Sequence, residues 1–208
     1  MSIFFRLLLA ALALFSASAL AQSPDAQDTR PPALFYADGG FGLYGNLGKS
    51  NPNYNADAGV DLNHNRLFAE FEGGADTANE SGGSTGYTYR LHGLLFYRGK
   101  SRWSYGGGVH YSEFTAQLYK KHDLWPTLAL LYERGPARVN FQYLFPGENT
   151  DYHEQGPLVD LRVHLIKGFY YRQRTDVLFY RDALQSPPAH HVGSENTFGV
   201  LYVFGKRH

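Results

Sequence analysis

The most regular feature of the chain is an alternation of bulky apolar and polar positions. In residues 87–97 (YTYRLHGLLFY), Tyr87, Tyr89 and Leu91 take alternate positions, and Thr88, Arg90 and His92 lie between them. Residues 102–112 (RWSYGGGVHYS) repeat the pattern. Successive side chains of a β-strand point to opposite faces, so a period of two predicts strands with one apolar and one polar face.

Ten segments follow this pattern. They are 39–47, 55–62, 67–75, 85–97, 102–114, 125–133, 138–145, 157–171, 176–181 and 196–204. The segments 39–47, 55–62 and 176–181 are the weakest, so an eight-stranded alternative stays open. Helical periodicity is poor, and no run after the N-terminal region reaches the roughly 18 apolar residues of a transmembrane helix. The pattern therefore predicts an all-β protein.

The predicted connections alternate in length. Four are short: 63–66 (NHNR), 98–101 (RGKS), 134–137 (RGPA) and 172–175 (RQRT). Five are longer and polar: 48–54, 76–84, 115–124, 146–156 and 182–195. Outer-membrane barrels have short periplasmic turns and longer external loops. We therefore predict an antiparallel, up-and-down transmembrane β-barrel of about ten strands.

A soluble β-sandwich or a lipocalin-like barrel would also alternate. Composition favours the membrane barrel, because 16 Tyr, 15 Phe and only 18% charged residues suit a surface that faces lipid. Expected aromatic belts comprise Tyr97, Trp103, Tyr132, Tyr170, Tyr171 and Phe204 at the turn side, and Tyr87, Trp125, Tyr143 and Phe145 at the loop side. The formal net charge of zero gives no sign of a nucleic-acid partner.

The N-terminal region is typical of an export signal. Arg6 precedes an apolar stretch, LLLAALALF, and Ala19-Leu20-Ala21 matches a cleavage site. We predict a signal peptide at 1–21 cleaved after Ala21, a flexible leader at 22–34 and a barrel domain at 35–208. The expected location is the bacterial outer membrane.

The last predicted strand carries a family resemblance. Phe198, Val200, Tyr202 and Phe204 alternate, which resembles the C-terminal signature of bacterial outer-membrane β-barrel proteins. Residues 205–208 follow the aromatic at which that family usually stops. The resemblance implies folding by the barrel-assembly machinery. The expected surroundings are outer-membrane lipid and lipopolysaccharide; no cofactor is predicted, and the oligomeric state is left open.

If the apolar face meets lipid, the polar face lines the lumen. The predicted lining residues are Asp57, Asp61, Glu70, Glu72, Arg90, His92, Arg102, Arg138, Asp160, Arg162 and His164, with His110 and Gln142 beside them. Buried charges are costly unless they are paired, so we expect ion pairs across the lumen. A ten-stranded barrel is only slightly wider than one that side chains fill. The chain would then be a structural or interaction protein, or a narrow pore.

A hydrolase is the alternative function. His110 and Ser112 share a strand face, and a base beside a hydroxyl can activate it for acyl transfer. The pair faintly resembles the His-x-Ser of outer-membrane lipid A deacylases, but Glu113 follows where that family has Asn, and the motif is far from the C-terminus. Two same-face polar residues are more often ordinary lumen lining.

Two weaker candidates complete the survey. Asp151-Tyr152-His153 resembles the Asp-x-His half of the omptin proteases, whose paired Asp-x-Asp is absent here; the corresponding loop offers only Asp76 and Glu80. His122, His153, His190 and His191 could meet at the outer rim, but they lack a metal-ligand spacing. We predict no metal site.

Overall fold

The computed structural model describes residues 31–46, 49–64, 66–79, 85–99, 102–116, 119–147, 152–166, 168–182 and 189–204. They form ten strands: β1 (Ala33–Asn46), β2 (Lys49–His64), β3 (Leu67–Asn79), β4 (Thr85–Arg98), β5 (Trp103–Ala116), β6 (Tyr119–Arg134), β7 (Ala137–Leu144), β8 (Tyr152–Ile166), β9 (Phe169–Asp182) and β10 (Ala189–Phe204). No helix in the described part of the chain is long and apolar enough to cross a membrane.

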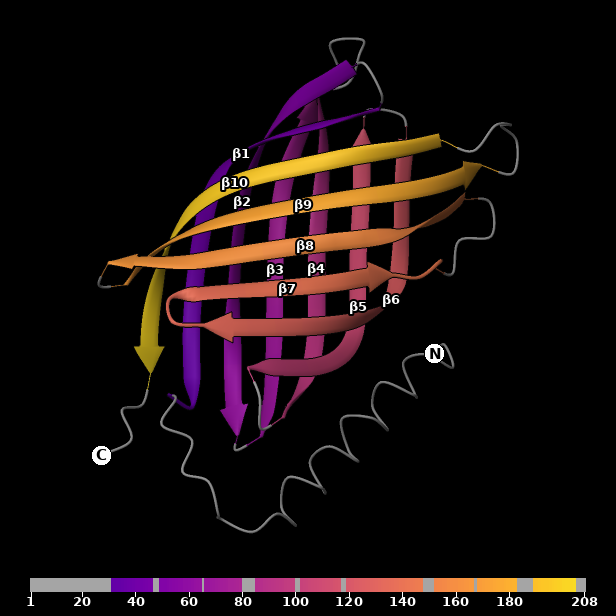
Figure 1. Cartoon of the computed structure of the whole chain (residues 1–208). Coiled ribbons are helices and arrows are strands. Elements are labelled where there is room, and N and C mark those ends of the chain that lie inside the picture. Colours follow the sequence, from indigo (N-terminus) through magenta and orange to yellow (C-terminus); the bar gives the residue numbers. More distant parts are fainter. Residues whose placement is uncertain are drawn as a thin grey trace.

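The strands close into one antiparallel barrel. Each strand pairs with its neighbours in sequence, and β1 pairs with β10 from Ala33↔Phe204 to Asn46↔His191. The strands of the front wall, β7 to β9, cross β3 and β4 of the back wall at a steep angle (Figure 1). Such a crossing follows from the tilt that closing a sheet requires. The prediction of a ten-stranded, up-and-down barrel is confirmed.

The barrel has a charged interior and an apolar exterior. In β9 the even-numbered residues from Tyr170 to Leu178 are buried and the odd-numbered residues between them are partly exposed. Phe169 and Phe179, on either side of this run, are exposed. The exterior carries large apolar side chains such as Phe41, Leu91 and Leu128, which are 60%, 59% and 61% exposed. The period of two therefore separates the two faces as the sequence predicts.

One predicted strand and one predicted turn are wrong. The segment 157–171 is divided between β8 and β9 by a turn that contains Gly168, whose φ is +85°. The predicted turn 172–175 instead lies within β9. Its composition is misleading, because Arg172 and Arg174 are polar residues that point into the barrel. A left-handed φ favours glycine, which explains why the chain turns at Gly168.

The strands also extend into several predicted loops. β2 begins at Lys49, β6 at Tyr119 and β10 at Ala189, so only residues 47–48 separate β1 from β2 and only 117–118 separate β5 from β6. The strict alternation of short and long connections is therefore wrong at these two places. Strands of up to 16 residues exceed the roughly 9–11 that span a membrane, so they project beyond the apolar band.

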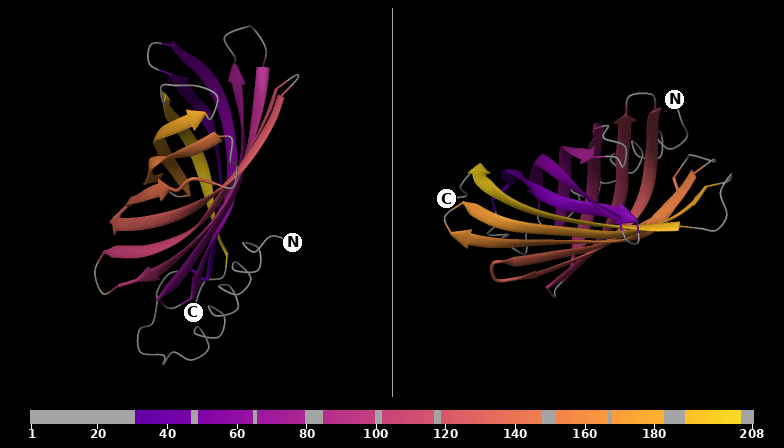
Figure 2. Two further views of the ribbon diagram at one scale, coloured as in Figure 1. Left: turned by 90° about the vertical axis from the view of Figure 1, so that its right-hand side faces the viewer. Right: turned by 90° about the horizontal axis from the view of Figure 1, so that it is seen from above.

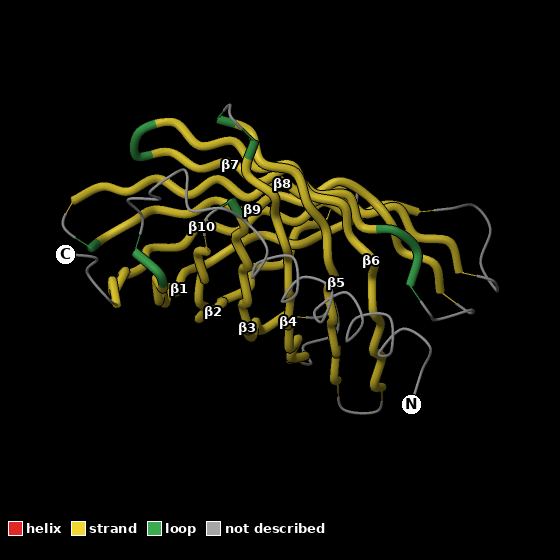
Figure 3. Tube along the Cα trace, turned by 90° about the horizontal axis from the view of Figure 1, so that it is seen from below, coloured by secondary structure: helices red, strands yellow, loops and turns green. Residues whose placement is uncertain are grey.

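Two apolar clusters lie inside the barrel. One contains Phe68, Leu94, Phe96, Ala129 and Leu131, near the turns that join β2 to β3 and β6 to β7. The other contains Trp125, Leu144 and Leu158, nearer the opposite end. The views from the side and from below show how the walls enclose the interior (Figures 2 and 3). Charged and uncharged polar side chains occupy the rest of it.

The N-terminal predictions fall largely outside these residues. The predicted signal peptide, 1–21, and residues 22–30 of the predicted leader are not among the described residues. The end of the predicted leader, Ala33 and Leu34, belongs to β1. Asn63 fixes Pro31 and Pro32 at the turn-side mouth, because its side chain donates to the Pro31 carbonyl and its backbone to that of Pro32, both at 2.9 Å.

Candidate functional site

The barrel interior concentrates ionised side chains. Ten carboxylates are buried: Asp38, Asp57, Asp61, Glu70, Glu72, Asp76, Asp123, Asp160, Asp176 and Glu195. Five arginines lie among them: Arg90, Arg138, Arg162, Arg172 and Arg174. We call these arginines and the carboxylates that they contact the ion-pair network. Burying so many charges is favourable only if each is compensated by nearby partners.

Arg172 is at the centre of the network. Its side chain is 2% exposed. Its guanidinium lies 2.5 Å from Asp160, 2.7 Å from Glu72 and 3.3 Å from Asp38. Because these carboxylates belong to β8, β3 and β1, one cation from β9 joins opposite walls of the barrel. The planar fork of an arginine suits this arrangement, since it offers five donors in fixed directions.

Glu72 is the most heavily shared carboxylate. It accepts hydrogen bonds from Arg172 and Arg174, and from the Tyr36 hydroxyl at 2.9 Å. The Arg162 guanidinium and the His92 ring nitrogen lie 3.7 Å and 3.8 Å from it. Charge-assisted hydrogen bonds of this kind are about twice as strong as neutral ones. Glu72 thereby holds together side chains from β1, β4, β8 and β9.

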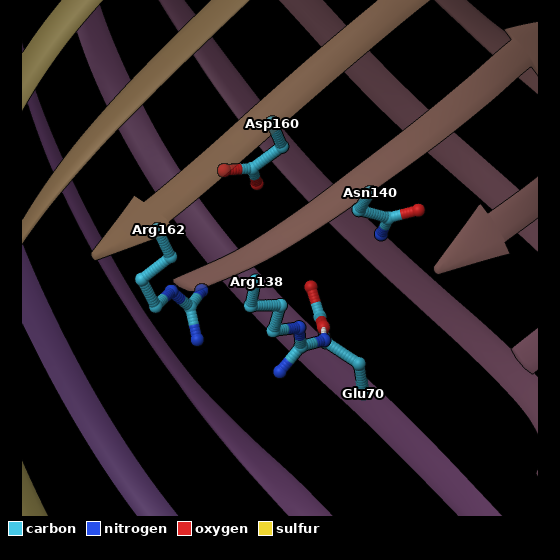
Figure 4. Close-up of a pocket in the computed structure, with 5 residues that line it drawn as sticks. All are labelled: Glu70, Arg138, Asn140, Asp160 and Arg162. Atoms are coloured by element: carbon cyan, nitrogen blue, oxygen red, sulfur yellow. Dashed lines mark hydrogen bonds and ion pairs between the residues drawn. The ribbon is translucent and has the colours of Figure 1, made fainter. Parts of the chain in front are cut away.

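Two smaller groups extend the network toward the barrel ends. Toward the turns, Arg138 pairs with Glu70 and, at 2.7 Å, with Asp61. Figure 4 shows the Arg138 guanidinium against the Glu70 carboxylate, with Asn140, Asp160 and Arg162 around them. The gap that these five residues line has no room for a water-sized molecule.

Toward the other end, Arg90 of β4 spans the lumen. Its guanidinium lies 2.8 Å from Glu195 of β10, 3.3 Å from Asp57 of β2 and 3.4 Å from Asp76 of β3. Arg90 is 21% exposed, more than any other arginine of the network. It therefore marks the side on which the network approaches solvent.

Aromatic rings support the cations from the wall. The Arg162 guanidinium lies 4.0 Å from the centre of the Tyr36 ring and 5.3 Å from that of Tyr170. These contacts supply cation–π attraction. Each tyrosine lies over the glycine paired with it on the next strand, Tyr36 over Gly59 and Tyr170 over Gly199. Covering strand glycines with aromatic rings is a known way to fix register in curved sheets.

Most of the predicted lumen residues come together. The predicted residues that lie inside are Asp57, Asp61, Glu70, Glu72, Arg90, His92, Arg138, Asp160 and Arg162. The arginines and carboxylates among them form ion pairs, and the His92 Nε2 lies 3.1 Å from Glu70 Oε1. Arg102 does not join them: it is exposed, in the turn before β5. His164 is exposed near the end of β8, where it lines a cavity of about 190 Å³ at the turn-side mouth with Asn63, Phe68 and Arg98.

The sequence reasoning missed the centre of the network. The composition of residues 172–175 predicts a turn that would hold Arg172 and Arg174, and the predicted lumen lining does not include Asp38 or Glu195. One signal was available: Tyr170, Arg172, Arg174 and Asp176 occupy alternate positions, as inward residues of one strand do. The pairing register of the strands brings Asp38 and Glu195 near Arg172 and Arg174, and this register cannot be read from the amino-acid composition.

The arrangement around His110 does not favour a nucleophile. Its Nε2 lies 2.7 Å from the Gln142 amide oxygen, and its ring is stacked obliquely at 4.8 Å from that of His92. Within the described part of the chain, no hydrogen bond joins His110 to Ser112. A catalytic base must be within reach of the proton that it accepts.

A metal ion does not fit the most suggestive cluster. Ligand atoms of Glu70, Glu72 and His92 lie within 4.8 Å of one another. Both carboxylates, however, already accept hydrogen bonds from guanidinium groups. The nearby Arg138 and Arg172 would repel a cation. Of the histidines considered for a rim site, His122 is exposed on β6, while the side chains of His153, His190 and His191 lie outside the described residues.

The exterior carries two aromatic belts. Trp103 and Tyr202 are exposed toward the turn side, and Tyr87 and Tyr143 toward the other. Two predicted members are wrong: Tyr170 and Trp125 point inward, 0% and 7% exposed. The side chain of Phe204 is outside the described part. A soluble barrel has an apolar interior and a polar exterior. This barrel has the reverse: a charged lumen and an apolar exterior with aromatic girdles. This is the architecture of an outer-membrane β-barrel.

No protein-family model matches the sequence, and no curated protein matches it. Solved structures do. Neisserial surface protein A has a TM-score of 0.41 and 10% identity, covering 83% of this chain and 97% of that one. The translocator domain of the autotransporter NalP from Neisseria meningitidis has a TM-score of 0.47 and 10% identity, covering 94% and 97%. CdiB from Acinetobacter baumannii has a TM-score of 0.28 and 9% identity, covering 82% and 60%.

Proposed function

We propose that the protein is a closed outer-membrane barrel with a structural or interaction role and no catalytic activity. One observation carries this proposal: the fully buried Arg172 joins Asp38, Glu72 and Asp160 across the lumen. The Arg172 guanidinium thus crosses the lumen, and the two apolar clusters narrow the interior further. The side chains hold the walls together instead of lining a channel.

The apolar exterior of the barrel indicates what surrounds it. We infer that lipid and lipopolysaccharide surround the apolar wall, because exposed Phe, Leu and Tyr side chains would be unfavourable in water. The alternate apolar residues at the end of β10 support folding by the barrel-assembly machinery. The lumen needs no cofactor in this proposal.

Planar-bilayer recording tests whether the lumen is closed. We expect the purified wild-type protein to give no stepwise conductance. The Arg172→Ser/Arg174→Ser variant, once its heat-modifiable gel mobility shows that it has folded, should give cation-selective steps, because it removes two side chains that cross the lumen and leaves an excess of carboxylates. Arg102→Ser, in an exposed turn, is the matched control and should resemble the wild type. Steady, well-resolved channels in the wild type would disprove the closed barrel.

Mass spectrometry of lipid A tests whether the protein acts as a lipid A deacylase. Cells overproducing the wild type and the His110→Ala and Ser112→Ala variants should have identical acylation profiles. A profile that changes with the wild type but not with Ser112→Ala would overturn this part of the proposal and assign a deacylase.

A further inference from the structure

The lipid-facing wall contains an island of polar side chains. In β9, Gln173 and Thr175 point outward, between the inward Arg172, Arg174 and Asp176. In β10, Ser194 and Asn196 point outward on either side of the buried Glu195. The sheet pairs Gln173 with Asn196 and Thr175 with Ser194, so all four are neighbours. We call Gln173, Thr175, Ser194 and Asn196 the polar patch.

Apolar residues surround the polar patch on every side. Along β9 it is followed by Val177 and the exposed Phe179, and along β10 the exposed Val192 and Phe198 flank it. On the adjacent strands, Val159 and Leu161 of β8 pair with Thr175 and Gln173. Phe41 and Leu43 of β1 pair with Asn196 and Ser194. The polar patch therefore lies within the apolar band and not at its edge.

The four side chains keep hydrogen-bonding capacity. The Tyr171 hydroxyl donates to the Asn196 amide oxygen at 2.6 Å. Within the described part of the chain, no side-chain hydrogen bond satisfies the Gln173 amide or the Asn196 amide nitrogen. In hydrocarbon there is no water to satisfy them, and an unpaired amide there costs several kcal/mol. Since apolar residues surround the polar patch on both strands and on the adjacent ones, we expect lipid headgroups not to reach it. The partner must be another membrane-spanning surface with polar groups at the same height.

We propose that the polar patch is the contact surface of a dimer of two copies of this chain. Asn and Gln amides both donate and accept, so the patch is complementary to itself when turned about a two-fold axis. A second copy has its polar patch at the same depth by construction. Thr175 and Ser194 are small enough to let the two walls approach closely, as residues at transmembrane contacts do. The proposal requires the barrel to span a membrane but not a closed lumen.

Thiol cross-linking in outer-membrane vesicles tests the contact directly. The natural chain has no Cys, so each substitution introduces the only thiol. We expect Asn196→Cys, Gln173→Cys or Ser194→Cys to form at least about tenfold more covalent dimer than Leu130→Cys with a short bifunctional maleimide. Leu130 is the matched control, since it is 42% exposed on the outward face of β6, a strand far from β9 and β10. Cross-linking no better than the control at all three positions would overturn the proposal.

Sedimentation equilibrium in density-matched micelles tests whether the Gln173 and Asn196 amides hold the dimer together. Gln173→Leu/Asn196→Leu should weaken dimerisation about tenfold or more, the effect of two interchain hydrogen bonds at the strength found in membranes. Gln173→Asn/Asn196→Gln should retain it. Heat-modifiable gel mobility confirms that each variant folds. A monomeric wild type, unaltered dimerisation of the leucine variant, or cross-links to a different protein alone would each contradict a self-dimer. Planar-bilayer results would not change in any of these cases.

Discussion

At the scale of single residues, the interior depends on a few shared charges. Glu72 accepts from Arg172, Arg174 and Tyr36, so its removal leaves two buried guanidinium groups short of a partner. Removing one partner of a buried pair is strongly destabilising, whereas removing an exposed pair has little effect. The contribution of each charge to the stability of the barrel therefore depends on how deeply it is buried.

Glu72→Ala tests this dependence. We expect the variant to lose about 3–5 kcal/mol of unfolding free energy, because Arg172 and Arg174 remain buried without it. Urea titration in lipid vesicles, followed by tryptophan fluorescence, measures the loss. Glu113→Ala is the control: Glu113 pairs with Lys120, which is 61% exposed, and its removal should have a far smaller effect. Equal losses in the two variants would refute the central role of Glu72.

The glycine below Tyr36 offers a second residue-scale prediction. A Cβ at Gly59 would lie 2.4 Å from the Tyr36 Cζ and Oη and 2.6 Å from the Phe71 carbonyl oxygen. Gly59→Ala should therefore displace the ring and destabilise the barrel by about 1–3 kcal/mol, as overpacking does. At Gly39, on β1, the nearest atom to a Cβ is the Asn55 carbonyl oxygen at 3.4 Å, so Gly39→Ala should be tolerated. The same urea titration compares them.

At the scale of elements, the sequence predicted the strands better than the turns. The alternation in residues 87–97 directly reflects the two faces of β4, so that strand was placed almost residue by residue. Around residues 165–172 the alternation carries over from β8 to β9 without an evident break, because apolar residues continue through Phe169 and Tyr171. Only the positive φ of Gly168, which composition does not reveal, marks the turn.

The candidate site was predictable as a set of inward polar positions but not as a set of contacts. Asp57 and Arg90 could be placed inside from the period of two alone. Their meeting depends on β2, β3 and β4 pairing in one register, and the contact from Arg90 to Glu195 depends on barrel closure. A residue shift in any pairing would exchange the two faces.

Insertions test the corrected assignment of β9. One Gly inserted between Gln173 and Arg174 would move the inward residues on one side of it to the outer face, and we expect no heat-modifiable folded barrel. One Gly inserted after Gly168 falls in the turn, which can absorb it, and the barrel should still fold. Folding of both proteins, measured by gel mobility in lipid, would instead support a turn at 172–175.

At the scale of the whole molecule, the two ends of the barrel differ. The start of β1 and the end of β10 lie at the end of the barrel where β2 turns to β3 and β6 to β7. The longer connections, 80–84, 145–151 and 183–188, lie at the opposite end. Short turns face the periplasm in bacterial barrels of this kind. The chain should therefore expose its longer connections outside the cell.

The two ends of β6 provide a test of this orientation. Lys120, 61% exposed, lies near its first residue, and Arg134, also exposed, is its last. At about 3.4 Å per residue and the usual tilt, the strand between them exceeds the roughly 25 Å apolar band, so both ends reach water. In a chain without Cys, a membrane-impermeant maleimide should label Lys120→Cys in intact cells. Arg134→Cys should react only after the outer membrane is permeabilised. Labelling of Arg134→Cys but not of Lys120→Cys in intact cells would show that the barrel has the opposite orientation. Equal labelling of both in intact cells would mean that β6 does not cross the membrane.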